Sequence, residues 1–137
     1  MFINDIKNSK IGLLKLDHQE AILYQRSNEF TQNPEKKHKH SDDWKAVGKI
    51  KNNAGGKSKN DEHRFFKKII KEISDFDFLL IAAHGKGSAN EGENLEAYIN
   101  KHYKNLGKKI MGHIATHNHR TENELLTEAD TFLNFRW

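Results

Sequence analysis

The segment FDFLLIAAHGKG, residues 76–87, is a nearly continuous apolar run that ends in glycines. A run of this length without polar alternation suits a strand that is buried on both faces of a sheet. We therefore predict a central strand here, and the segments on either side of it complete the fold.

Two helices are predicted next to the central strand. Before it, apolar residues recur at three- and four-residue spacing over residues 65–73, and Asn60 or Asp61 is the predicted N-cap. After it, a second helix is predicted over residues 89–106. Gly107 is placed to end that helix, because glycine is favoured just after a helix C-terminus.

The last third of the sequence adds a strand and a helix. KKIMGHIATH, residues 108–117, is predicted as a strand. In TENELLTEADTFLNF, residues 121–135, Thr121 precedes Glu124 by three residues, which is the spacing of a capping box. An apolar stripe follows, so we predict a third helix.

The first third of the sequence predicts a β-hairpin. In KIGLLKLDHQEAILYQR, residues 10–26, two apolar segments are joined tightly at Asp17, whose side chain is expected to form the turn. Residues 27–60 are polar and contain the only proline, Pro34. A third strand fits on either side of that proline.

The order β-β-β-α-β-α-β-α predicts an α/β fold, a mixed sheet with helices on its faces, in a single domain over residues 1–137. Zero cysteines exclude a disulfide scaffold, a zinc ribbon and thiol catalysis. No run is long enough for a signal peptide or a membrane span. We therefore expect a cytoplasmic protein without a membrane partner.

Positive charge gathers in the middle of the sequence. Residues 36–71 hold twelve Lys or Arg against four Asp or Glu, whereas the rest of the chain holds eleven against fifteen. A basic segment on a mildly acidic body predicts one surface that faces a polyanion, and a solvated loop is the alternative explanation.

Several motifs occur in one order along nearly the whole chain: LDHQEA, HKH, AGGKS, FFKKI, FLLIAAHGKG and HNHRTENELLTEADTFL. With these motifs the chain resembles the middle domain of archaeal and eukaryotic class-1 peptide chain release factors and of Pelota. It is closer still to small bacterial single-domain translational machinery proteins. The resemblance implies a ribonuclease-H-like fold with a long basic loop over residues 31–59, and a role in translation.

In release factors this loop carries Gly-Gly-Gln, which helps water attack the ester of peptidyl-tRNA. Here Gly55 and Gly56 match the glycines, Lys57 takes the place of the glutamine, and Ser58 matches the serine that commonly follows. The glycines still allow close approach to RNA. Lysine offers only donors and a charge, so it favours phosphate contact over positioning a water.

Metal chemistry is not predicted. The histidine pairs in residues 38–40 and 117–119 match no zinc-helix spacing, and we interpret them as surface histidines. A two-metal nuclease needs several carboxylates that converge at strand ends, and only Asp17, Asp77 and Glu20 are candidates. Neither a metal nor a cofactor is therefore expected.

The glycines allow two other interpretations, a phosphate-binding P-loop and a ligand site at the end of the central strand. A phosphate-binding P-loop needs a glycine five residues before Gly56, and that position is Lys51. Gly85 and Gly87 follow the central strand, where open α/β sheets often bind ligands, although a plain strand-to-helix turn explains them equally.

The sequence thus predicts a translation-related protein that binds ribosomal RNA or tRNA without efficient peptide release. One alternative is a peptidyl-tRNA hydrolase, with Gly55, Gly56 and Lys57 as its catalytic candidates. The other is a module for a non-RNA ligand or a protein. The sequence indicates no oligomeric state. The predicted RNA-binding residues are Lys36, Lys37, Lys39, Lys45, Lys49, Lys51, Gly55, Gly56, Lys57 and Lys59.

Overall fold

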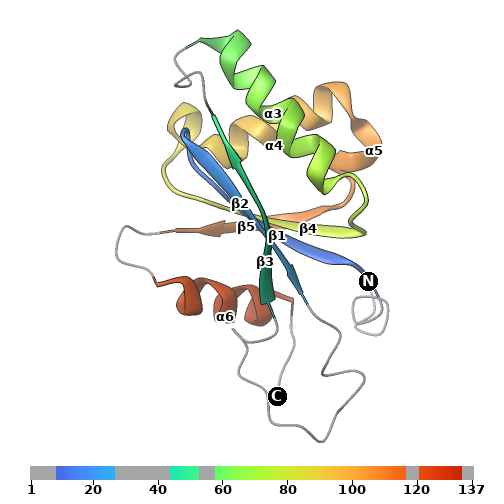
Figure 1. Ribbon diagram of the computed structural model, residues 1–137, viewed down its shortest axis with the longest axis vertical. Helices are drawn as coiled ribbons and strands as arrows, with labels where there is room; N and C mark the ends of the chain where they lie inside the picture. The colour runs from blue at the N-terminus through green and yellow to red at the C-terminus, as the bar shows by residue number, and fades with distance from the viewer. Residues whose placement is uncertain (1–8, 27–43, 53–57, 117–120, 134–137) are drawn as a thin grey trace, which may run out of the picture.

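The computed structural model describes residues 9–26, 44–52, 58–116 and 121–133 (Figure 1). The elements follow one another in the predicted order, with a 3₁₀ turn and a short helix added around the second long helix. They are β1 (Ile11–Leu16), β2 (Glu20–Arg26), β3 (Trp44–Lys51), α3 (Lys59–Ile73), β4 (Phe78–Ala83), η2 (Gly87–Ala89), α4 (Glu91–His102), α5 (Lys104–Gly107), β5 (Ile110–Ala115) and α6 (Glu122–Phe132).

The strands form one mixed sheet in the order β3-β2-β1-β4-β5. β2 pairs antiparallel with both β1 and β3, whereas β4 lies parallel to both β1 and β5. The predicted fold class, a mixed α/β sheet reached through a strand meander and then alternating helices and strands, is confirmed.

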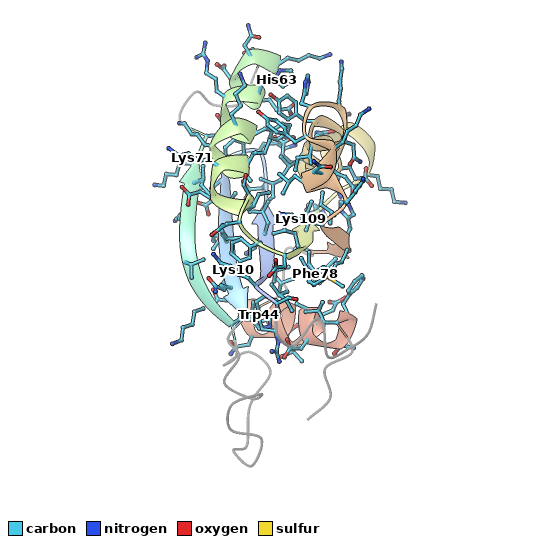
Figure 2. The ribbon with its side chains drawn as sticks, turned by 90° about the vertical axis from the view of Figure 1, so that its right-hand side faces the viewer. Lys10, Trp44, His63, Lys71, Phe78 and Lys109 are labelled. Carbon is cyan, nitrogen blue, oxygen red and sulfur yellow. The ribbon has the colours of Figure 1, made fainter. Side chains whose placement is uncertain are left out.

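Helices cover both faces of the sheet (Figures 1 and 2). On one face Phe65 of α3 and Ile99 of α4 belong to one buried cluster, and on the other face Leu126 of α6 belongs to a second. Consecutive residues of β4, Leu79 and Leu80, enter opposite clusters, which confirms that this strand is buried on both faces. In the described part of the chain, no helix combines the length and apolarity that crossing a bilayer requires.

The hairpin turn forms as predicted. Asp17 Oδ1 accepts hydrogen bonds from the backbone nitrogens of Gln19 and Glu20, at 2.7 and 2.8 Å. This carboxylate satisfies two donors that the sharp reversal leaves without strand partners.

The N-cap prediction for the first long helix was wrong. Ser58, and neither Asn60 nor Asp61, caps α3: Ser58 Oγ accepts a hydrogen bond from the nitrogen of Asp61 at 3.1 Å. The apolar spacing determines which face of the helix is buried. It does not choose among the three good capping residues within Ser58–Asp61.

The predicted helix over residues 89–106 is divided in two. Asn90 caps α4, which ends at His102 because Tyr103 has the non-helical dihedrals φ −140° and ψ 64°. α5 then ends at Gly107, the residue predicted to terminate the segment.

The predicted loop over residues 31–59 is not one continuous loop. Residues 44–51 form β3, so the third strand lies after Pro34, and α3 begins at Lys59. β3 is an edge strand whose pairing with β2 shifts register opposite Leu23 and Tyr24. The irregularity breaks the period-2 alternation by which a strand is recognised in sequence.

A buried carboxylate joins β2, β3 and α6. Thr121 caps α6 as predicted, by accepting from the nitrogen of Glu124. One turn before the end of α6, the fully buried Asp130 accepts from Arg26 Nε at 3.0 Å and from Trp44 Nε1 at 2.8 Å. Arg26 ends β2 and Trp44 begins β3, so one oxygen atom fixes both strands to the helix.

We expect Asp130→Ala to lower the free energy of unfolding by about 3–5 kcal/mol, because it removes the carboxylate that is ion-paired with the buried Arg26 guanidinium. Urea unfolding followed by tryptophan fluorescence measures the change. Thr127→Ala, on the exposed side of the same helix, is the control and should stay within about 0.5 kcal/mol of the parent. A loss below about 1 kcal/mol in Asp130→Ala would contradict the role given to this carboxylate.

Candidate functional site

Four of the ten predicted RNA-binding residues lie in the described part of the chain. Lys45, Lys49 and Lys51 are on β3 and Lys59 begins α3, and all four are exposed. The remaining six lie outside the described residues: Lys36, Lys37, Lys39, Gly55, Gly56 and Lys57. The histidines at 38, 40, 117 and 119 also lie outside them.

Helix α3 adds further basic side chains beside β3, on the face of the sheet opposite to that of Lys49. Its basic side chains face solvent, and Lys71 points outward on the side where β3 forms the edge of the sheet (Figure 2). Residues 44–51 and 58–73 carry eight basic residues against three acidic ones, Asp61, Glu62 and Glu72. The eight define the β3–α3 basic surface: Lys45, Lys49, Lys51, Lys59, Arg64, Lys67, Lys68 and Lys71.

Acidic neighbours neutralise only part of this surface. Lys49 Nζ lies 3.3 Å from Glu20 Oε2, and Arg64 lies 3.7 Å from Asp61. Both ion pairs are at the surface, where such pairs are weak and easily exchanged for another anion. The other six cations of the surface form no ion pair within the described ranges.

Lys15 is a basic residue that the sequence reading did not select. It is exposed on β1 and is the Cα partner of Ile22, which in turn partners Lys49. Residues opposite one another in neighbouring strands place their side chains on the same face. Lys15 and Lys49 therefore share one sheet face. The sequence signal that could have identified Lys15 is a lone lysine in an otherwise apolar strand.

The residues that flank segment 53–57, which contains the Gly-Gly pair, are held by hydrogen bonds. Asn52 donates from its backbone nitrogen to Gln19 O at 2.8 Å and from Nδ2 to His18 O at 3.1 Å. At the other end Ser58 caps α3. The segment thus starts beside the β1–β2 turn and ends at the N-terminus of α3.

A cluster of titratable side chains lies at this same place. His18 of the turn, Glu62 in the first turns of α3 and Glu91 at the start of α4 each bring a nitrogen or oxygen atom within 4.8 Å of the others. His18 Nδ1 is 3.0 Å from Glu91 Oε2, and Glu91 is only 2 % exposed. The carboxyl ends of the parallel strands β1 and β4 bring these segments together.

The Glu62 carboxyl group has an altered acidity. Burial, its hydrogen bond with Glu91 and repulsion from the Glu91 charge together raise the pKa of Glu62 to about 7, against the smaller opposing effects of His18 and Lys59. The cluster therefore brings two carboxyl groups close together under conditions that disfavour both being charged.

Gly92 allows Glu91 to reach the interior. A Cβ atom at Gly92 would lie 2.7 Å from Ile81 Cγ2 and 2.9 Å from Ala83 Cβ, so only glycine lets the first turn of α4 approach β4 this closely. Sequence analysis did not single out His18, Glu62, Glu91 or this glycine. They come from separate segments, and although His18 lies in the LDHQEA motif, no motif links it to Glu62 or Glu91.

The other predicted elements do not form a ligand site in the described residues. The Gly85 carbonyl accepts from Asn90 Nδ2 at 3.2 Å, and a Cβ at Gly85 would meet the Ala89 backbone, so the turn packs on itself. Asp17 follows the carboxyl end of β1 whereas Asp77 precedes β4, which runs parallel to it. The two carboxylates therefore lie at opposite ends of the sheet and do not converge.

Comparison with known proteins confirms the fold. No family model and no curated protein matches the sequence. Among solved structures, Pelota from Archaeoglobus fulgidus matches 96 % of this chain with a TM-score of 0.63 and 10 % identity. Pelota from Thermoplasma acidophilum matches 90 % with a TM-score of 0.57 and 15 % identity.

The matched region is one part of a larger protein, because the chain spans 34 % and 33 % of the two Pelota chains. The class is thus an α/β domain with the fold of one third of Pelota. The predicted resemblance to Pelota is confirmed at the level of fold.

We expect Gly92→Ala to destabilise the protein by about 1–3 kcal/mol, since the added methyl group overpacks the contact between α4 and β4. Chemical denaturation measures the loss. Glu93→Ala, the exposed neighbour in the same turn, is the control and should cost about 0.5 kcal/mol or less. Stabilisation of Gly92→Ala, as helix propensity alone predicts, would show that the close approach is not maintained in solution.

Proposed function

We propose that this chain is a translation-related RNA-binding domain that contacts ribosomal RNA or tRNA through the phosphates facing its β3–α3 basic surface. The observation that carries the proposal is the charge of that surface, eight cations against three acids on two adjacent elements. These cations lie on a strand and a helix, whose backbones are already ordered. Binding a phosphate therefore costs only the conformational entropy of the lysine and arginine side chains themselves.

The fold supports the translation part of the proposal. Its structural matches are Pelota proteins, and the sequence resemblance independently points to Pelota and to the release-factor middle domain. The ribosome is accordingly the proposed partner. The basic segment that the resemblance assigns to RNA continues, in the described residues, into β3 and the start of α3.

Efficient peptide release is not part of the proposed function. Lys57 stands where release factors carry glutamine, and an ammonium group cannot accept a hydrogen bond from water. In the sequence, Lys57 lies between Lys51 and Lys59 of the β3–α3 basic surface, which supports a phosphate contact for this lysine.

We expect Lys49→Glu/Lys51→Glu to weaken binding to ribosomes and tRNA by about tenfold or more near 0.1 M salt, with a flatter dependence of log affinity on log salt. Co-sedimentation and filter binding across a salt series measure both effects. Lys108→Glu is the matched control, because Lys108 is exposed beside β5 at the opposite edge of the sheet. A salt-independent affinity, or equal losses in both variants, would contradict the proposal.

In a peptidyl-tRNA hydrolysis assay on ribosomes, we expect no release above the uncatalysed rate. Lys57→Gln, which restores the release-factor residue, tests whether the side chain alone prevents hydrolysis. Release by the parent chain that Gly55→Ala abolishes would instead support the peptidyl-tRNA hydrolase alternative.

A further inference from the structure

Three side chains of the kinds that bind metal ions meet where β1, α3 and α4 come together. We propose that His18, Glu62 and Glu91 bind a divalent transition-metal ion such as Zn²⁺ or Mn²⁺. The inference is independent of RNA binding and concerns residues outside the β3–α3 basic surface.

The geometry is close to what such an ion requires. Metal–ligand bonds of about 2.1 Å in a tetrahedral site place neighbouring ligand atoms about 3.4 Å apart. His18 Nδ1 and Glu91 Oε2 are 3.0 Å apart, and all three ligand atoms lie within 4.8 Å of one another. Glu62 and His18 are partly exposed, so small rotations of their side chains can close the larger separation.

The charge of the cluster calls for a cation. Glu91 is 2 % exposed, and its only ion-pair partner among the described residues is His18. Glu62 brings a second carboxylate to the same place. Placing a second carboxylate against the buried Glu91 is costly unless a proton or a cation compensates the charge, and a dication bound between the two carboxylates does so directly.

Neighbouring groups orient two of the three ligands. Asn94 Nδ2 donates to Glu91 Oε1 at 2.9 Å, which leaves Oε2 facing His18. The other ring nitrogen of His18, Nε2, lies 3.2 Å from the carbonyl oxygen of Ala89. With Nδ1 on the metal, Nε2–H donates to this carbonyl, the support that metal-binding histidines commonly have.

The elements that meet here also anchor segment 53–57. Asn52 donates to the carbonyl of His18, and Glu62 lies one turn beyond Ser58. An ion shared by His18, Glu62 and Glu91 therefore cross-links the two attachment points of that segment to α4. Three protein ligands leave at least one coordination position for water.

The test measures thermal unfolding of the chelator-treated full chain with ZnCl₂ or MnCl₂ added, together with titration calorimetry. At an ion concentration about 100-fold above Kd, we expect the midpoint to rise by about 5 °C or more. His18→Gln and Glu62→Gln should each weaken binding at least about tenfold. His18→Gln is the fold-safe variant, since the side chain is half exposed.

His113→Gln is the matched control. His113 Nε2 lies 3.0 Å from Glu96 Oε1, the same contact as in the cluster, but no third ligand joins this pair in the described residues. Its variant should bind the ion like the parent. No midpoint rise with either ion would overturn the proposal. So would binding that persists in both His18→Gln and Glu62→Gln, which would place the ion on other histidines, such as those at 38, 40, 117 and 119.

Discussion

The buried Asp130 carboxylate is the constraint on which the described structure depends most. Its Oδ1 accepts from Arg26 and from Trp44, and these two residues are also Cα partners in the pairing of β2 with β3. The carboxylate therefore fixes the register of the edge strand at its first residue. A slip of one residue would turn the side chains of an edge strand to the opposite face. The position of Lys45 thus follows from a polar contact inside the core, whereas Lys49 and Lys51 lie beyond the register shift.

Much of the fold could be predicted from the sequence, because the patterns that mark its buried strand, helix face and turn each lie within a short segment. The apolar run of β4, the stripe of α3 from Phe65 to Ile73 and the Asp17 turn each depend on a few neighbouring residues, and all three form as expected. A third strand was expected, but the position of the edge strand β3 could not be assigned, and its residues were included in the predicted loop. Its residues are mostly exposed, its register shifts, and it is fixed through Asp130, which lies far away in the sequence.

The candidate functional residues, too, could be predicted from the sequence only in part. Lysines 45, 49, 51 and 59 were predicted because charge density is visible along a chain, and the structure finds all four exposed. The cluster of His18, Glu62 and Glu91 could not be predicted, because its members are brought together only when β1 and β4 align in parallel and α3 and α4 pack on one face. Each residue alone resembles an ordinary turn or helix-start residue.

The β3–α3 basic surface and the cluster of His18, Glu62 and Glu91 differ in the kind of electrostatic interaction that they offer. Exposed lysines attract phosphates through a field that salt screens over about 10 Å at 0.1 M ionic strength. An ion held by His18, Glu62 and Glu91 is bound directly, with Glu91 almost fully buried, so salt screens that interaction far less. A chelator acts directly only on the bound ion, and salt acts mainly on the attraction between lysines and phosphates. Because a bound dication would cancel the negative charge of Glu62 and Glu91 close to Lys59, it would also make the start of α3 more attractive to a polyanion. The two sites would therefore reinforce one another while remaining separable by experiment.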